Sequence, residues 1–408
     1  MLLVEFLRRT VRRGCIRYID SADRHHVVGE SHLEPQVIVR SRSRRLDWLL
    51  SARPTLLVGE AYMAGAITIE HGTLYDFIAI VASQEPEGAR PIWVRLLDVL
   101  RSPLRQFNSV ERSRRNVAHH YDLSGALYRL FLDADRQYSC AYFRTPHDTL
   151  EQAQANKKAH IAAKLLLDRP GLQILDIGSG WGGLGLYLAD VADADVTGVT
   201  LSTEQHAASV ERAAQRGLSE RAQFHLRDYR HVRGRYDRIV SVGMFEHVGR
   251  RNYPEFFKKL GDLMEDDGIA VLHSIGFNEL PGPIDPFIQK YIFPGADLPT
   301  LSEVLKVIEA SGLLVSDVEV LQYHYADTLA HWRARFMANW QAAAAIYDER
   351  FCRMWEYYLV LCEVGFRFRD MMVFQIVLAH KKSALPATRD HMVDWERGQA
   401  PRVAERVR

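Results

Sequence analysis

The amino-acid sequence predicts an α/β protein with a Rossmann-like, mostly parallel sheet and a smaller α+β domain in front of it. Two observations lead to this prediction. After residue 173, apolar runs of strand length alternate with helical segments, which is the pattern of right-handed βαβ crossovers. The first of these runs, "ILDIGSGWGG" from Ile174, passes through glycines into a helix, as the first unit of such a sheet does.

The composition of the 408-residue chain sets further bounds. A hydrophobic content of 47% is enough for two or three domains with real cores. No apolar run approaches the ~20 residues that span a bilayer, and the N-terminal run is broken too early for a secretory signal. The four cysteines have neither CxxC nor metal-ligand spacing. We therefore expect a cytoplasmic protein without a membrane span, disulfide or bound metal.

Residues 1–100 are predicted to form the small α+β domain, with a lipid-facing or dimerising role. Strand-like runs such as "PQVIVRS" and "AITIEHG" alternate there with helical segments such as "LYDFIAIVA". A basic linker is expected at residues 101–118. Residues 1–118 carry 18 Lys and Arg against 13 Asp and Glu, an excess that fits an anionic membrane surface or a solvated face and is too small to indicate nucleic acid.

Residues 2–13 have separate apolar and basic positions at helical spacing. This pattern is typical of a helix that lies in a membrane interface, and it equally fits a helix that packs on its own domain. The apolar positions are Leu3, Phe6, Leu7 and Val11, and the basic ones are Arg8, Arg9, Arg12 and Arg13.

The main domain is predicted at residues 119–382. Its strands are expected at "QILDIG", "DVTGVTL", "AQFHLRD", "YDRIVSVGMF", "GIAVLHSIG" and "MMVFQIVLAH". Between the last two, residues 277–370 are rich in aromatics and mostly helical in pattern, so a helical insertion is expected as a lid over the strand ends. The tail, residues 383–408, is polar and is expected to fray.

The glycine-rich turn predicts a nucleotide-like cofactor. Gly178, Gly180 and Gly183 have the spacing that lets backbone N–H groups approach a polar ligand at a helix N-terminus. The second strand lacks the acidic residue with which nicotinamide proteins bind ribose, and offers Thr200 and Gln205 instead. After the third strand, Asp228 or Tyr229 is a candidate for contact with an adenine. The remaining alternative is an α/β domain that binds no cofactor.

Several blocks, in order, resemble the cyclopropane fatty acid synthases, a family that depends on S-adenosylmethionine and includes the mycolic acid cyclopropane synthases. They include "HHYDLSGALYRLFLD", "YSCAYF", "LDIGSGWGG", "VTLSTEQ", "VGMFEHVG", "YIFPG", "HYADTL" and "FRFRDMMVFQ". The resemblance covers residues 115–382, and the front domain is similar to that of the longer bacterial synthases. It implies a class I methyltransferase with a seven-stranded sheet, and a homodimer peripherally associated with the inner face of the membrane.

The resemblance also implies site residues. Those for S-adenosylmethionine are Tyr138, Ser139, Asp176, Gly178, Gly180, Trp181, Gly182, Thr200, Leu201, Gln205, Tyr229 and Arg230. A bicarbonate ion is expected to act as the base, held by the backbones of Cys140 and Val242 and the side chains of Glu246, His273 and Tyr325. Taken singly, Glu246 also fits a helix N-terminal carboxylate and His273 a core histidine. Cys362 matches the cysteine traditionally called the family's active-site thiol, and we interpret it as a packing residue near the site rather than a nucleophile.

The expected reaction adds one carbon to an olefin, a poor nucleophile whose methylated product is a carbocation. Such a reaction needs a strong methyl electrophile, exclusion of water and a positioned base. The resemblance implies that the acceptor is an unsaturated phospholipid acyl chain and the product a cyclopropane. Proton loss from another carbon would give a methylene- or methyl-branched chain instead. A non-catalytic lipid-binding homologue is the alternative from another class.

Overall fold

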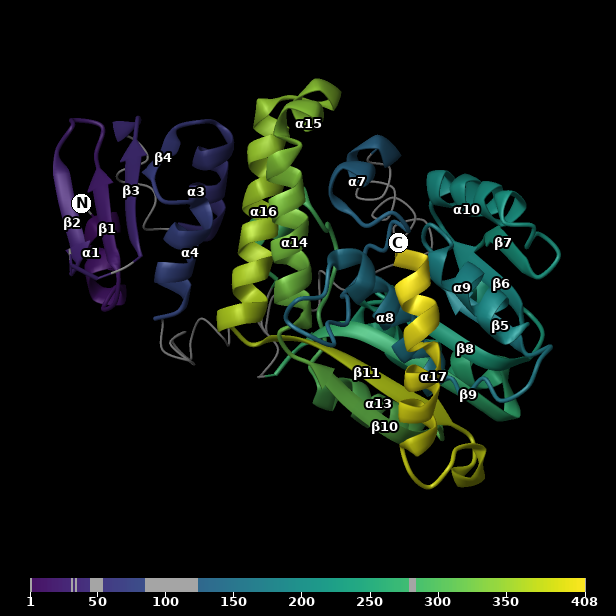
Figure 1. Ribbon diagram of the computed structural model, residues 1–408. Helices are drawn as coiled ribbons and strands as arrows, with labels where there is room; N and C mark the ends of the chain where they lie inside the picture. Colours follow the sequence, from purple (N-terminus) through teal and green to yellow (C-terminus); the bar gives the residue numbers. More distant parts are fainter. Residues whose placement is uncertain are drawn as a thin grey trace. The chain divides into compact units, whose positions relative to one another are not determined.

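The computed structural model of the chain describes residues 2–30, 32–33, 35–44, 54–84, 124–278 and 284–407. These residues form two compact units, which we treat separately. Unit 1 comprises Met1–Ser102, Gly282–Pro294 and Leu329–Met371, and unit 2 comprises Pro103–Pro281, Gly295–Thr328 and Met372–Arg408. Figure 1 labels the helices and strands of both units.

Unit 2 is built around a seven-stranded sheet with the strand order β10-β11-β9-β8-β5-β6-β7. β5 pairs in parallel with β6 and β8, and the pairs β6–β7 and β8–β9 are also parallel, whereas β10 is antiparallel to β11. The predicted α/β fold with a mostly parallel sheet is therefore confirmed. The strands are β5 (Gln173–Ile177), β6 (Asp195–Thr200), β7 (Ala222–Leu226), β8 (Tyr236–Val242), β9 (Met264–Phe277), β10 (Leu314–Leu321) and β11 (Met371–Ala379).

The six runs predicted as strands all form strands, but β10 was not predicted. It lies within residues 277–370, for which a mostly helical insertion was expected, and that expectation is wrong there. The reason is that β10 is an edge strand whose apolar residues are interrupted by charged ones. Asp317 and Glu319 alternate with Val318 and Val320, so the segment lacks the continuous apolar run of the central strands.

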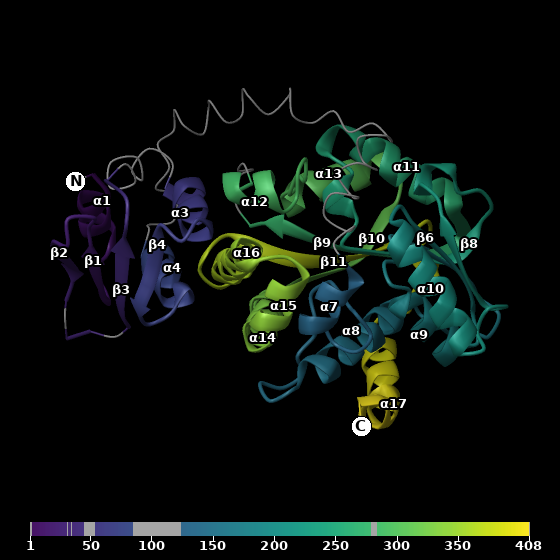
Figure 2. The ribbon, with the colours of Figure 1, turned by 90° about the horizontal axis from the view of Figure 1, so that it is seen from above.

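Helices cover both faces of this sheet. Neighbouring strand residues point to opposite faces: Ile174 of β5 packs in one apolar cluster with α8 (Leu150–Lys164), α9 (Gly183–Ala192) and α10 (Thr203–Gln215). Leu175 packs in a second cluster with α11 (Tyr253–Leu263) and α13 (Leu301–Ser311). Figure 2 shows α11 and α13 on one side of the sheet and α8 on the other.

The strand order places a binding crevice at the end of β5. From β5 the chain moves outward through β6 to β7, and it then returns to the other side of β5 as β8. Ligands of open parallel sheets bind where the order reverses in this way, at the carboxyl ends of the strands. The crevice is therefore expected between the residues that follow β5 and β8, which include the glycine-rich turn.

Unit 1 contains a four-stranded sheet with the order β2-β1-β3-β4, which confirms the small N-terminal α+β fold. β3 and β4 correspond to the two predicted strands, and β1 and β2 are additional. Its strands are β1 (Cys15–Ile19), β2 (His25–Gly29), β3 (Gln36–Ser41) and β4 (Ile67–His71). Its helices are α1 (Leu2–Thr10), α3 (Pro54–Met63), α4 (Leu74–Ala82), α12 (Pro286–Tyr291), most of α14 (His324–Ala338), α15 (Trp340–Ile346) and α16 (Glu349–Phe368).

The helical insertion is divided between the two units, whereas we expected all of it in the C-terminal domain. The cause is direct packing of α16 and α12 on the N-terminal helices. Tyr62 of α3 donates a hydrogen bond to the Glu356 carboxylate of α16 at 2.6 Å, and the Arg353 guanidinium donates to the Met63 carbonyl at 3.0 Å. The ring of Phe287 lies 4.6 Å from that of Tyr357.

The amphipathic N-terminal segment forms α1, and its apolar side packs within unit 1. Val4, Leu7 and Val11 are each at most 5% exposed, while Arg8 and Arg12 are exposed. Of the two interpretations of residues 2–13, the structure supports the packing helix, because side chains already buried in a core are unavailable to a membrane.

The C-terminal tail, expected to fray, contains the helix α17 (Asp390–Val407), which packs on α8 (Figures 1 and 2). The Glu396 carboxylate contacts the imidazole of His160 and accepts a hydrogen bond from Arg144 at 3.0 Å. The expectation is thus wrong for this segment, because the tail has buried polar partners. The predicted linker at residues 101–118 lies outside the described residues. Among those that are described, no helix is long and apolar enough to cross a membrane.

Candidate active site

The glycine-rich turn after β5 forms the floor of a pocket in unit 2. Gly178 and Gly180 have φ angles of +85° and +55°, which residues with a Cβ rarely adopt. At Gly178 a Cβ atom would also lie 2.8 Å from the Cβ of Met244. These glycines are therefore required for the backbone to follow this turn and to enter α9 with its N–H groups facing the pocket.

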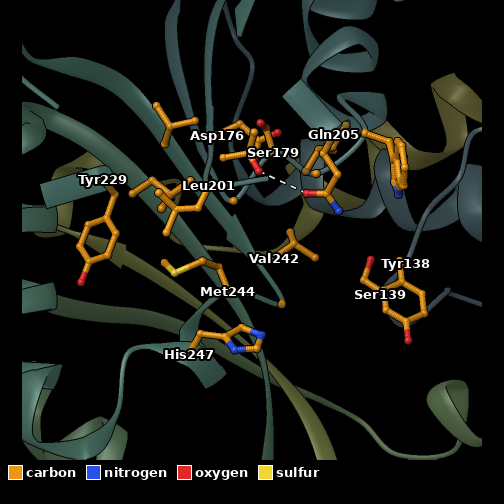
Figure 3. A pocket seen from close by; sticks show the side chains of 18 of the residues that line it. Tyr138, Ser139, Asp176, Ser179, Leu201, Gln205, Tyr229, Val242, Met244 and His247 are labelled. Carbon is orange, nitrogen blue, oxygen red and sulfur yellow. Dashed lines mark hydrogen bonds between the residues drawn. The ribbon is translucent and has the colours of Figure 1, made fainter. Parts of the chain in front are cut away.

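Eleven of the twelve residues that the sequence assigns to the cofactor line this pocket. The exception is Gly182, where a Cβ would point at Ser209 and Phe224 on the core side. Figure 3 shows Tyr138 and Tyr229 on opposite sides of the pocket, with Val242 and Met244 between them. The lining residues that we did not assign include Arg136, Gln137, Ser179, Gly183, Arg227, Gly243, Met244 and His247.

The candidate ribose contacts follow β6. The hydroxyl of Thr200 donates a hydrogen bond to the side-chain oxygen of Gln205 at 3.2 Å, the dashed line of Figure 3. This bond uses the amide oxygen of Gln205, so the amide nitrogen is oriented as a donor. Both side chains are buried. Neutral polar groups thus occupy the position that an acidic residue holds in nicotinamide sites.

After β7 the pocket is lined by Asp228, Tyr229 and Arg230. Arg230 donates to both carboxylate oxygens of Asp228, at 2.9 and 2.8 Å. Burial alone would raise the pKa of Asp228, but these bonds outweigh it and leave the pKa below its usual value. The ring of Tyr229 packs edge-on against Phe256, with centroids 5.4 Å apart. This packing holds the tyrosine as a fixed flat wall of the pocket.

Asp176, the fourth residue of β5, has an available carboxylate oxygen at the pocket. Burial raises the pKa of Asp176 to about 7, with the Lys157 ammonium acting in the opposite direction. Its Oδ2 atom has no hydrogen-bond partner among the described residues. A buried polar atom without a partner is costly, by about 1–3 kcal/mol, unless a ligand or water completes its bonding. Asp176 therefore fits a pocket that is completed by a polar ligand.

Three of the predicted base residues meet at the ends of β8 and β9. Val242 is the register partner of His273 across the two strands. Glu246 follows β8 in a short 3-10 helix, and its Oε1 atom accepts the backbone N–H of Ile275 at 2.7 Å. Oε2 has no partner among the described residues. Burial raises the pKa of Glu246 to about 7, although the backbone N–H groups of Ile275 and Glu246 and the hydroxyl of Ser274 act in the opposite direction.

The other two predicted base residues lie on segments that are joined to each other. The N–H of Ala141, next to Cys140, donates to the Thr328 hydroxyl at 3.0 Å. Thr328 in turn donates to the His324 carbonyl at 2.6 Å in the first turn of α14, which also carries Tyr325. Cys140 is buried, and burial raises the pKa of its thiol. A buried neutral thiol leaves the backbone as the polar group of this residue.

Lys157 lies between the proposed cofactor residues and the proposed base residues, which are the two halves of the site. No sequence pattern predicted it. It is 1% exposed and donates to Gln137 at 2.5 Å and to Ser139 at 2.8 Å. Burial lowers the pKa of Lys157 to about 8. Its charge acts on the pKa values of three residues that belong to both halves, namely Cys140, Asp176 and His273.

Cys362 lies on α16, in unit 1. Burial raises the pKa of its thiol, whereas a nucleophilic cysteine needs a lowered one. A raised pKa is unfavourable for a nucleophile, and the interpretation of Cys362 as a packing residue near the site stays a prediction. His247, which lines the pocket, has a pKa lowered to about 4 by burial, so its imidazole is neutral. Its place directly after Glu246 was the signal that could have identified it.

A seven-stranded sheet with a glycine-rich turn and a pocket at the β5–β8 reversal defines a class I methyltransferase fold. A family model described as mycolic acid cyclopropane synthetase matches residues 108–376. The chain belongs to this family, whose members depend on S-adenosylmethionine.

Curated relatives match more of the chain than this family model does. The chain is 40% identical over 328 residues to the cyclopropane-fatty-acyl-phospholipid synthase of Escherichia coli strain K12, covering 80% of this chain and 83% of that one. It is 37% identical over 364 residues to a probable fatty acid methyltransferase of Pseudomonas putida, covering 84% and 92%.

A solved structure of a relative has a similar fold. The mycolic acid cyclopropane synthase CmaA1, determined as a complex with S-adenosylhomocysteine (SAH) and CTAB, is 34% identical to this chain with a TM-score of 0.62. The match covers 67% of this chain and 99% of that one.

Proposed function

We propose that the protein transfers the methyl carbon of S-adenosylmethionine to the cis double bond of an unsaturated phospholipid acyl chain and closes a cyclopropane ring. The proposal includes a bicarbonate ion, held by Cys140, Val242, Glu246, His273 and Tyr325, as the base. The name of the Escherichia coli relative supports the acceptor and the product. The observation that carries the proposal is the buried Glu246 carboxyl, with one oxygen fixed by Ile275 and the other without a partner among the described residues.

The residues of the pocket fit S-adenosylmethionine. Asp176 Oδ2, Ser179 Oγ and Trp181 Nε1 are buried and lack partners among the described residues, so the pocket offers both acceptors and donors to a ligand. Thr200 and Gln205 are placed for ribose hydroxyls, and Tyr229 for a flat ring. When bound, the cofactor supplies an electrophilic methyl group on a positively charged sulfur.

The proposed base site offers donors to an anion. A carboxyl with a pKa of about 7 is protonated in about half of the molecules at neutral pH, so Glu246 can donate from Oε2 while Oε1 accepts from Ile275. His273 is neutral, because burial and nearby positive charges lower its pKa to about 3, and a neutral imidazole also has one donor. Bicarbonate, when bound between such groups, supplies a general base.

A methylated but open-chain product is the second candidate, and the Pseudomonas putida relative, named a probable fatty acid methyltransferase, favours it. Both reactions use the same pocket and differ only in which proton is removed. We favour the cyclopropane because the Escherichia coli relative, 40% identical over 80% of this chain, is named a cyclopropane-fatty-acyl-phospholipid synthase.

The test uses the full-length protein, S-adenosylmethionine with a ¹³C-labelled methyl group, and vesicles of a cis-monounsaturated phospholipid. NMR of the extracted acyl chains is expected to show the label in upfield cyclopropane signals. Vinyl or branched-methyl signals would replace the proposal with the open-chain product. Absence of label from the lipid, with cofactor binding intact, would contradict a phospholipid acceptor.

A further inference from the structure

A line of buried polar side chains leads from His273 to α8, away from the pocket. The side-chain nitrogen Nε2 of Gln375 on β11 lies 3.1 Å from His273 Nδ1. The ammonium of Lys164 donates to the Oε1 atom of the same glutamine at 2.6 Å. His273, Gln375 and Lys164 are all at most 2% exposed. Polar groups buried this deeply have few alternative partners, so each contact restricts the next.

The chemistry of these groups fixes the direction of every bond. An ammonium group can only donate, so the atom of Gln375 that faces Lys164 must be its oxygen. The amide nitrogen must then face His273, and because it too can only donate, Nδ1 of the imidazole must accept. Burial and nearby positive charges lower the pKa of His273, which leaves the ring neutral with a single proton. That proton is therefore on Nε2.

Burial lowers the pKa of Lys164, and the Glu319 carboxylate behind it acts in the opposite direction and favours the ammonium form. Lys164 contacts the Glu319 carboxylate on β10, which also accepts from His160 Nε2 at 2.7 Å. Burial by itself would raise the pKa of Glu319, but His160 and Lys164 lower it to about 2. His160 also contacts Glu396 of α17. The lysine is thus anchored through α8, β10 and α17, elements that carry none of the proposed anion ligands.

We propose that Gln375 and Lys164 are positioning residues that hold His273 in the Nε2–H tautomer, so that its one donor is directed by the fold rather than by the ligand. The inference rests on the proposed function only in naming the bicarbonate ion as the acceptor of the hydrogen bond from His273 Nε2. An imidazole whose proton could lie on either nitrogen would have to adopt the donating tautomer when the anion binds. A fixed tautomer removes this reorganisation.

The first test reads the tautomer directly in the full-length protein labelled with ¹⁵N in its histidine rings. His273 is identified by the signals missing from the His273→Asn protein. We expect a protonated Nε2 and an unprotonated Nδ1, unchanged between pH 6 and pH 8. A proton on Nδ1 in the wild-type protein would overturn the inference.

Substitution at residue 375 then tests the cause. In Gln375→Glu the carboxylate accepts from Lys164 and from His273, so the proton is expected to move to Nδ1. Arg389→Gln is the matched control. It removes an ion pair with Asp317 on β10, the edge strand that also carries Glu319, and should leave the His273 signals unchanged. If Gln375→Glu fails to fold, Gln375→Met serves in its place and is expected to give a mixture of tautomers. An unchanged tautomer in a folded variant would overturn the proposed cause.

Kinetics separate this inference from the proposed function. We expect Gln375→Glu to raise the bicarbonate concentration for half-maximal rate by about tenfold or more, because Nε2 of His273 then carries no proton to donate to the anion, with little change in the KM for S-adenosylmethionine. A wild-type rate that does not depend on bicarbonate would remove the proposed base, while the NMR result would still decide the tautomer. Bicarbonate dependence that is equal in wild type and variant would contradict the positioning role alone.

Discussion

The two halves of the candidate site are built in different ways. Most residues of the cofactor half lie at or directly after the carboxyl ends of β5, β6 and β7, and Tyr138 and Ser139 are added from the segment before α8. The base half is assembled across strands, since Glu246 is fixed by Ile275 of β9 and His273 by Gln375 of β11. Both halves contain a buried carboxyl with a raised pKa, Asp176 in the first and Glu246 in the second. Because the two halves depend on different contacts, binding and proton removal are expected to fail independently.

The largest expected effect is at Glu246. Glu246→Gln keeps the size of the side chain but removes an ionisable group from the proposed base site, so turnover should fall by about 100-fold or more. Cofactor affinity, measured by calorimetry, should change by less than about twofold. A comparable loss in affinity would place Glu246 in the cofactor half and erase the distinction between the halves.

Gly178→Ala should produce the opposite pattern. The new Cβ would lie 2.8 Å from that of Met244, and the φ of +85° is strained for alanine, so cofactor affinity should fall by about tenfold or more. Gly217→Ala is the matched control, because Gly217 has a φ of +66° with nothing within 4 Å of its Cβ. Gly217→Ala should lose stability in urea unfolding through its strained φ alone, and Gly178→Ala should lose more because of the added clash. Equal cofactor affinities in the two variants would contradict the conclusion that the turn at Gly178 forms the floor of the cofactor pocket.

The buried carboxyl of Glu246 should also make stability depend on pH. Its pKa is raised from 4.5 to about 7 in the folded protein, so the folded state binds more protons than the unfolded state in this window. The contribution of Glu246 to stability is then fully present below pH 4.5 and is lost as pH rises through about 7, by up to about 3 kcal/mol. Glu246→Gln lacks this contribution. From pH 5 to pH 8, the free energy of unfolding measured in urea should therefore fall more for the wild-type protein than for Glu246→Gln. A constant difference between the two proteins would contradict the raised pKa.

The smallest effect concerns unit 1. Because Val4, Leu7 and Val11 are buried, we expect the exposed arginines of residues 2–13 to make any contact with an anionic membrane. Replacing Arg8, Arg12 and Arg13 with Gln should weaken sedimentation with anionic vesicles by about 1 kcal/mol per residue or less at low salt, and scarcely at high salt. The melting temperature should not change. Equal binding at both salt concentrations would remove α1 from the membrane contact.

The difference between the halves also explains what could be predicted from the sequence. Gly178, Thr200 and Tyr229 each follow a recognisable apolar run, so pattern alone placed them at the strand ends. Lys157, Lys164 and Gln375 gave no such signal, because their partners lie across the fold and a buried lysine is indistinguishable in sequence from an exposed one. Glu246 and His273 were identified through a family resemblance, and their shifted pKa values depend on burial that only the fold supplies.

The same reasoning applies to the elements that were missed. β10 is an edge strand in which Asp317 and Glu319 interrupt the apolar run, and Glu396 of α17 has a polar partner, His160, on α8. The association of α16 with the N-terminal helices depends on contacts such as Tyr62 with Glu356, between residues 294 positions apart. Local pattern predicts elements with one apolar face and misses those whose interactions are polar or distant.

The most direct test of the account measures methyl transfer to phospholipid vesicles in buffer depleted of carbon dioxide, with bicarbonate then added in steps and cofactor binding followed in parallel. We predict that the rate is low without bicarbonate and rises to saturation as it is added, while the affinity for S-adenosylmethionine stays constant. A full rate in depleted buffer would contradict an anion as the base and leave the buried groups around Glu246 without their proposed function.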